Sequence, residues 1–228
     1  MPDLKIALVE AVSDSTHVYS RTYLPRAGVA TLGAVLHKIG YSVDIFIHSM
    51  TAQEEKQLAT YDVVGIGSLS STIDEAYCLA DYLKSKNTTV VMGGPHVTFM
   101  PEEAIEHCDF AVLGEGEGAL PELLSAIENR TSPEQVKGLV YKKPDGSIHY
   151  TGPSDFVDYK SLPSPDFQLS AHVIPKNIPP IITTSRGCPH NCSFCSVTSV
   201  FGRKYRFKSK EQVISELRAV QHRSVCFG

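Results

Sequence analysis

The stretch Asp62-Val63-Val64-Gly65-Ile66-Gly67, followed by Ser68-Leu69-Ser70-Ser71-Thr72, decides the fold class of this chain. Residues 62–67 form a short, mostly apolar run that is typical of a buried strand. Residues 72–86 then place their apolar side chains on one helical face, at Ile73, Ala76, Tyr77, Ala80 and Leu83. A strand that passes through a short polar loop into an amphipathic helix is the repeating unit of a parallel α/β sheet.

The same unit recurs on both sides of this stretch. Further strands are predicted at residues 4–9, 42–47, 89–92 and 110–113, and further helices at 28–39, 52–60, from 101 onward and at 117–129. Five strands alternating with five helices predict an α/β fold with a doubly wound, parallel, five-stranded sheet over residues 1–130. Ligands of such sheets bind beyond the carboxyl ends of the strands. This rule selects the loops 10–28, 68–72, 93–101 and 114–117 as candidate binding loops.

The sequence changes character after residue 129. Residues 138–142 and 147–150 flank Pro144-Asp145-Gly146 and are predicted to form a hairpin. Residues 151–180 contain six prolines and no periodicity, which predicts a linker wrapped on the surface. A strand is predicted at 179–185, and a helix at 209–222 with a capping box of Ser209 and Gln212. We therefore divide the chain into residues 1–130, a hairpin and linker at 131–180, and a third region at 181–228.

Composition and charge limit the possible classes of protein. The chain has 228 residues, is 42% hydrophobic and carries a net charge of −4. No apolar run approaches the roughly 20 residues needed to span a bilayer, and the N-terminus does not resemble a signal peptide. We therefore expect a cytoplasmic protein with reduced thiols. Residues 186–228 contain eight Arg or Lys residues against two Glu, and we expect them to meet acidic partners elsewhere in the protein rather than nucleic acid.

Three of the six cysteines, Cys188, Cys192 and Cys195, are crowded into eight residues with the spacing C-x3-C-x2-C. Crowded thiols in a reducing compartment favour a metal site over disulfides. Three thiolates can hold three irons of a [4Fe–4S] cluster and leave one iron open to a substrate or cofactor. On spacing alone, two alternatives stay open: a zinc site with His190 or Cys226 as fourth ligand, and no metal at all.

Residues 184–195, Thr-Ser-Arg-Gly-Cys-Pro-His-Asn-Cys-Ser-Phe-Cys, closely resemble the signature of the radical S-adenosylmethionine (SAM) superfamily. The resemblance implies a [4Fe–4S] cluster on Cys188, Cys192 and Cys195 that binds SAM and reductively cleaves it to a 5′-deoxyadenosyl radical. It also implies that Phe194 lies near the adenine and that residues 181–228 begin a (β/α) barrel. A reductant protein such as flavodoxin or ferredoxin would supply the electron.

The order of the parts resembles the radical SAM enzymes that carry an N-terminal cobalamin-binding domain, which are related to magnesium-protoporphyrin IX monomethyl ester cyclase. The markers are residues 25–28 with 32–36, 67–71, 93–98 and 114–117. They imply cobalamin contacts at Ser68, Leu69, Ser70, Ser71, Gly93, Gly94, Pro95, His96, Gly114, Glu115 and Gly116. Hydroxyls and amides at a helix N-terminus suit a phosphate, and glycines let the backbone approach a flat ring. The plainer alternative is that 93–96 and 114–117 are only tight turns before helices.

One marker of other cobalamin modules is missing. The chain has no Asp-x-His-x-x-Gly motif, with which methyl-transfer modules ligate cobalt. The radical SAM branch often lacks this histidine, so the resemblance stands.

The resemblance implies a cobalamin-dependent radical SAM reaction on a small-molecule substrate. Methyl transfer is the favoured reaction, and an oxidative cyclisation is the alternative. A corrinoid-binding module without chemistry and a zinc-stabilised protein are alternatives from other classes. We expect Cys78 and Cys108 to be structural thiols. We also expect the chain to be a truncated piece of its parent, because one strand and one helix cannot close a barrel, and to have no turnover alone.

Overall fold

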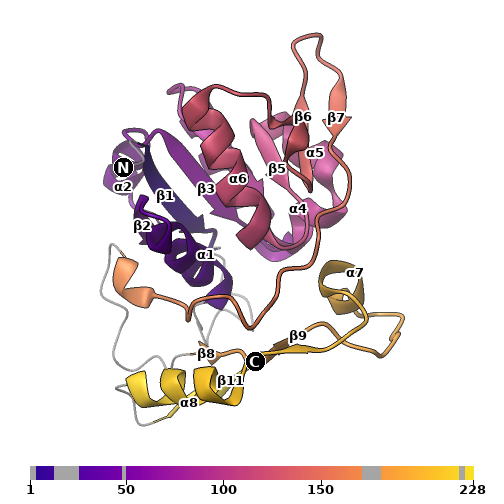
Figure 1. The fold of residues 1–228 in the computed structure, drawn as a ribbon. Helices are drawn as coiled ribbons and strands as arrows, with labels where there is room; N and C mark the ends of the chain where they lie inside the picture. Colours follow the sequence, from indigo (N-terminus) through magenta and orange to yellow (C-terminus); the bar gives the residue numbers. More distant parts are fainter. Residues whose placement is uncertain (1–3, 13–25, 48–49, 171–180, 221–223) are drawn as a thin grey trace.

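The computed structural model describes residues 4–12, 26–47, 50–170, 181–220 and 224–228 (Figure 1). Its parallel core consists of β1 (Lys5–Glu10), β2 (Ser42–Phe46), β3 (Val63–Gly67), β4 (Thr89–Gly93) and β5 (Phe110–Val112), in the order β2-β1-β3-β4-β5. The order reverses between β1 and β3, which is the switch point of a doubly wound sheet. The predicted doubly wound α/β class is therefore confirmed.

The five strands predicted for residues 1–130 are confirmed as β1 to β5, and the complete sheet has seven strands. The predicted hairpin, β6 (Leu139–Lys142) and β7 (Ile148–Tyr150), continues the sheet beyond β5 as two antiparallel strands. An uncovered β5 edge would leave a row of backbone N–H and C=O groups unpaired, and β6 pairs with them. The sequence pattern indicates a hairpin but carries no information about which edge it joins.

Two apolar layers cover the two faces of the sheet. α1 (Ala27–Lys38) and α6 (Gly116–Asn129) cover one face, and they lie in front of the sheet in Figure 1. α2 (Ala52–Leu58), α3 (Ile73–Lys84) and α5 (Pro101–His107) cover the other. Successive strand residues alternate between the layers, so that Ile6 and Leu8 face α1 and α6 while Ala7 and Val9 face the opposite layer.

Two short helical elements differ from the prediction. The loop predicted after β4 contains a helix, α4 (Pro95–Phe99), with proline at its first position. The loop after β3 contains a single 3-10 turn, η1 (Ser70–Thr72), directly before α3. Both begin at the carboxyl edge of the sheet, so they bring their preceding loops close to that edge.

The predicted linker follows the surface of the sheet domain after β7. Another 3-10 turn, η2 (Pro133–Gln135), precedes the hairpin, and η3 (Phe167–Leu169) ends the described part of the linker next to β2. There Ser170 forms a bridge with Ile45, and the Asp166 amide donates to the Ala30 carbonyl at 3.2 Å. Tyr159 is buried although the rest of the linker is mostly accessible. Residues 171–180 lie outside the described residues.

The third region contains the beginning of a second parallel sheet. β8 (Ile181–Ile182) pairs in parallel with β11 (Cys226–Phe227), and α8 (Lys210–Ala219) lies between them in the sequence. This βαβ unit agrees with the expected start of a (β/α) barrel. The capping box of α8 is confirmed, since Ser209 Oγ accepts from the Gln212 amide at 3.1 Å and Gln212 Oε1 accepts from the Ser209 amide at 2.8 Å.

The single strand predicted at 179–185 is two short strands instead. β9 (Ser185–Arg186) follows β8 after two residues and pairs antiparallel with β10 (Arg206–Phe207). The cysteine loop, residues 187–196, and α7 (Val197–Phe201) lie between β9 and β10. Among the helices that the structure describes, none has the length and apolar character required to cross a membrane.

Candidate functional site

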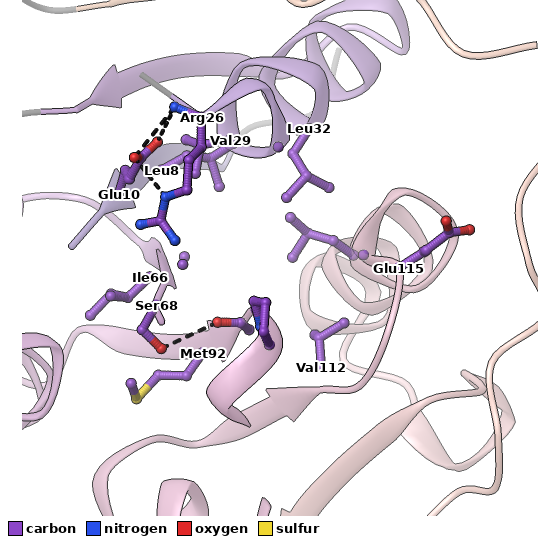
Figure 2. Close-up of a pocket in the computed structure, with 18 of the residues that line it drawn as sticks. Leu8, Glu10, Arg26, Val29, Leu32, Ile66, Ser68, Met92, Val112 and Glu115 are labelled. Atoms are coloured by element: carbon purple, nitrogen blue, oxygen red, sulfur yellow. Dashed lines mark hydrogen bonds and ion pairs between the residues drawn. The ribbon is translucent and has the colours of Figure 1, made fainter. Parts of the chain in front are cut away.

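A cavity of about 290 Å³ opens at the carboxyl ends of β1, β3 and β4, on the face covered by α1 and α6. Two rows of in-register residues form its floor: Leu8, Gly65 and Val91, then Glu10, Gly67 and Gly93 one pleat further. The glycines place no side chain between the sheet and the helices, so a gap stays open there. Figure 2 shows the cavity with its lining residues around the open centre.

The walls of the cavity are mainly apolar. α1 contributes Val29 and Leu32, α6 contributes Leu120, and β5 contributes Val112. Concave, mostly apolar sites with a few fixed polar groups are typical of sites for organic ligands and cofactors. The arrangement therefore suits a flat organic group inserted between a sheet and two helices.

An ion pair lies at one side of this cavity. Glu10 is buried, and its Oε1 accepts from Nε of Arg26 at 2.7 Å. Burial raises the pKa of Glu10, and the neighbouring guanidinium only partly offsets this effect. In Figure 2 the side chain of Arg26 extends from Glu10 toward the middle of the cavity. The cavity thus has a cationic group at its rim.

The loops after β3 and β4 are in direct contact at the cavity rim. Gly94 has a φ of 102°, which favours glycine, and a Cβ atom there would overlap the carbonyl oxygen of Ser68. The Ser68 amide donates to the Gly93 carbonyl at 3.0 Å, and the Leu69 amide donates to Thr72 Oγ1 at 3.1 Å. These two amides already have partners, so they are not free to bind a phosphate.

Comparison with known proteins connects this cavity with one family. Residues 18–124 match the family model of the B12 binding domain. The chain contains a B12-binding domain. The match begins after β1 and includes α1, β3, β4 and the loops after β3, β4 and β5 that line the cavity.

Two relatives in sequence extend beyond the B12-binding domain. An uncharacterised methyltransferase of Pyrococcus horikoshii is 36% identical over 71% of this chain and 37% of its own length. The anaerobic magnesium-protoporphyrin IX monomethyl ester cyclase of Rubrivivax gelatinosus is 30% identical over 86% of this chain and 39% of its own length. The chain thus spans little more than a third of these curated relatives. Its relatives are methyltransferases and cyclases, so the family is one of enzymes.

A solved structure shares the fold. The cobalamin-dependent S-adenosylmethionine radical enzyme OxsB, with aqua-cobalamin and S-adenosylmethionine bound, matches with a TM-score of 0.79 and 21% identity. The match covers 95% of this chain and 31% of that chain. The B12-binding domain and the region after it therefore have the fold that this enzyme has over the same extent.

Most of the predicted cobalamin contacts line the cavity of the B12-binding domain. The eight that do are Ser68, Leu69, Gly93, Gly94, Pro95, Gly114, Glu115 and Gly116. Ser70, Ser71 and His96 are not part of its lining. Ser70 Oγ lies 2.9 Å from His96 Nδ1, and His96 Nε2 lies 3.5 Å from Glu103, so these side chains connect the two rim loops beside the cavity.

Sequence reasoning missed several lining residues. Leu8 and Val91 belong to the strands themselves, where period-two alternation with the apolar face could have identified them. Arg186, Val200 and Phe201 come from the third region, far away in the sequence. No local sequence pattern predicts that these residues reach the cavity of the B12-binding domain.

The cysteine loop lies between two elements that reach this cavity. Arg186 on β9 precedes the loop, and Phe201 on α7 follows it. Gly187 has a φ of 84°, and a Cβ atom there would overlap the Lys204 carbonyl oxygen, which agrees with the sharp turn expected before the first cysteine. Phe194 is 90% exposed.

The three thiols of the loop are unpaired and accessible. Cys192 is exposed, Cys188 and Cys195 are half-buried, and Cys188 Sγ lies 3.9 Å from the Tyr205 hydroxyl. Within the described residues, no three His, Cys, Asp or Glu side chains are close enough together to hold a metal ion. The structure thus places the thiols on one loop without gathering their sulfur atoms.

Cys78 and Cys108 should differ strongly in reactivity. Burial raises the pKa of the Cys108 thiol to about 12, whereas Cys78 is exposed on α3. Because the thiolate is the nucleophile, we expect iodoacetamide at pH 8 to modify Cys108 more than about a hundredfold more slowly than Cys78. Peptide mass spectrometry at timed intervals measures both rates. Equal rates in the folded chain would contradict the burial of Cys108, and urea should remove the difference.

Proposed function

We propose that this chain holds cobalamin in the cavity described above, as part of a B12-dependent radical SAM enzyme. The observation that carries the proposal is the glycine-floored cavity at the switch point of a B12-binding domain. Eight of the residues that the family resemblance marks as cobalamin contacts line that one cavity. We propose that cobalamin binds at this cavity.

The residues of the cavity fit part of a cobalamin molecule. Gly67 and Gly93 let a planar group approach the backbone, and apolar side chains from α1 and α6 would cover its other side. The Arg26 side chain extends toward the open centre of the cavity, so we propose that it meets the negatively charged phosphodiester of the nucleotide tail. This assignment replaces the loop amides at Ser68 and Leu69, which are already bonded.

The cysteine loop fits a [4Fe–4S] cluster by the chemistry of its donors. We propose that the unpaired thiols of Cys188, Cys192 and Cys195 bind three irons and that SAM binds the fourth, with Phe194 beside its adenine. When bound, these groups supply a carbon-centred radical, and cobalamin supplies a carrier for a methyl group. The elements on either side of the loop line the cobalamin cavity, so this chain would hold both cofactor sites on adjoining elements.

The reaction that we propose is methyl transfer to a small-molecule substrate. The uncharacterised relative from Pyrococcus horikoshii is a methyltransferase by name, whereas the Rubrivivax relative is a cyclase, which makes oxidative cyclisation the second candidate. We propose a flavodoxin or ferredoxin as the electron donor and the cytoplasm as the location, since all six cysteines are free. The chain alone is expected to show no turnover.

Filling the cavity should abolish cobalamin binding. A Cβ atom at Gly93 meets its nearest neighbour at 3.7 Å, so the Gly93→Leu variant should fold and place its side chain in the cavity. We expect hydroxocobalamin to bind the unchanged chain stoichiometrically and to bind the variant more than about tenfold more weakly. Anaerobic absorbance titration, read after removal of free corrinoid, measures the binding.

Gly118→Leu is the matched control, because Gly118 is exposed on α6 and does not line the cavity. Binding that survives in Gly93→Leu would show that cobalamin does not use this cavity. Absence of binding in all three proteins would overturn cobalamin binding by this chain.

A further inference from the structure

A buried network of ions lies at the rim of the cavity, with Glu115 at its centre. The Glu115 side chain is 0% exposed. Its two carboxylate oxygens accept from Nη1 and Nη2 of Arg206 at 2.7 and 2.6 Å, which is the bidentate geometry of the strongest carboxylate pairs. The same carboxylate also accepts from the Val157 amide at 3.0 Å. Glu115 therefore joins three segments that are far apart in the sequence.

A second guanidinium completes the network. Arg186 Nη1 donates to Glu115 at 3.3 Å, and Arg186 Nη2 donates to Glu117 at 2.5 Å. Burial alone lowers the pKa of Arg186, but Glu117 and Glu115 outweigh it and raise the pKa above its usual value. Two carboxylates thus balance two guanidiniums, so the buried charges compensate one another. This pairing also agrees with the expectation that the basic third region meets acidic partners within the protein.

The two arginines bracket the cysteine loop. Arg186 lies on β9 immediately before the loop, and Arg206 lies on β10, the strand that pairs with β9 after α7. Phe156 and Tyr159 of the linker pack against the two guanidiniums at 4.7 and 4.9 Å. The segment from β9 through the cysteine loop and α7 to β10 is consequently attached to the B12-binding domain through the carboxylates of Glu115 and Glu117.

The orientation of Glu115 argues against a direct contact with cofactor. Figure 2 shows its carboxylate pointing away from the open centre of the cavity. Both oxygens already accept hydrogen bonds from Arg206, and Arg186 and Val157 add two more. A carboxylate with this many donors has little remaining capacity to bind another group.

We propose that Glu115 is a positioning residue that holds the cysteine loop against the cobalamin cavity and couples the two sites. The role of Glu115 in coupling the two cofactor sites rests on the function proposed above. Its attachment of the cysteine loop to the B12-binding domain requires no cofactor. Because Arg186, Val200 and Phe201 line the cavity, a molecule that fills the cavity also contacts the elements around the loop. Binding in the cavity and ordering of the loop should therefore favour each other.

The attachment is tested by hydrogen–deuterium exchange on the full chain without cofactors. Glu115→Gln keeps the size of the side chain but removes the charge that compensates Arg206. We expect exchange in residues 186–208 to become about tenfold faster, including the Cys188 and Lys208 amides, which donate to Gly202 and Thr184. Exchange in β1, β3 and β4 should stay unchanged.

Glu106→Gln is the matched control, because Glu106 forms an ion pair with Lys142 far from the loop. Arg206→Gln provides a second variant that does not alter the B12-binding domain itself, and the double variant should be no faster than either single variant. Unchanged exchange in residues 186–208 of Glu115→Gln would overturn the proposal. Equal acceleration throughout the sheet would also overturn it, because Glu115 would then only support the fold.

The coupling is tested by adding hydroxocobalamin. In the unchanged chain, we expect bound cobalamin to slow exchange in residues 186–208 by about tenfold. In Glu115→Gln, we expect cobalamin to bind as well, but to slow exchange in these residues much less. Bound cobalamin with no effect on these residues in the unchanged chain would overturn the coupling. If neither protein retains cobalamin, the proposed function fails, and the cofactor-free comparison still decides whether Glu115 holds the loop.

Discussion

Replacing Cys192 by serine is expected to abolish assembly of the iron–sulfur cluster. After anaerobic reconstitution with iron and sulfide, the unchanged chain should contain about four irons, and Cys192→Ser fewer than about one. The reason is that a cluster held by only three protein thiolates cannot lose one of them and stay bound. Cys192 is exposed, so its replacement should leave the fold intact. Iron and sulfide analysis, combined with circular dichroism, measures both properties.

Cys78→Ser is the matched control, because Cys78 is likewise exposed but lies on α3, outside the cysteine loop. It should bind as much iron as the unchanged chain. Zinc without sulfide in the purified chain would favour the zinc alternative, with His190 or Cys226 as a fourth ligand. Full iron content in Cys192→Ser would contradict the assignment of this loop to a cluster.

Gly94→Ala is expected to destabilise the B12-binding domain by about 3 kcal/mol. The φ of 102° is unfavourable for any residue with a Cβ atom, and that atom would also overlap the Ser68 carbonyl oxygen. The loops after β3 and β4 would have to separate, which changes the rim of the cavity. Urea denaturation followed by circular dichroism measures the loss of unfolding free energy.

Gly93→Ala is the control for this prediction. Gly93 lies next to Gly94 and lines the same cavity, but its φ is not positive and its Cβ atom would have ordinary contacts. We expect its free energy of unfolding to change by less than about 1 kcal/mol. Similar losses in the two variants would show that the close contact between Gly94 and Ser68 does not determine stability.

The sequence predicted the elements of the sheet domain well because their signals are local. The apolar run at 62–67 and the helical stripe from Ile73 to Leu83 each follow from a period of two or 3.6 residues. The rule that ligands bind at the carboxyl edge then selected loops that line the observed cavity. The helix α4 was missed because five residues are too few to establish a helical period.

The features that the sequence did not predict depend on contacts between distant residues. The pairs Glu115–Arg186 and Glu115–Arg206 join residues that are 71 and 91 positions apart. The resemblance marked Glu115 as a cobalamin contact, whereas the structure directs its carboxylate to the two arginines. Sequence patterns identify which residues matter more readily than they identify the partner of each residue.

The path of the linker has a consequence for association between copies of the chain. A long open sheet usually exposes two edges, each able to recruit a strand from another molecule. Here the outer edge at β7 is only three residues long, and Ser170 pairs with Ile45 on β2, the opposite outer strand. The linker therefore covers part of the β2 edge, and the shortness of β7 leaves few backbone groups available for pairing at the other edge. We expect the sheet domain to resist edge-to-edge aggregation for this reason.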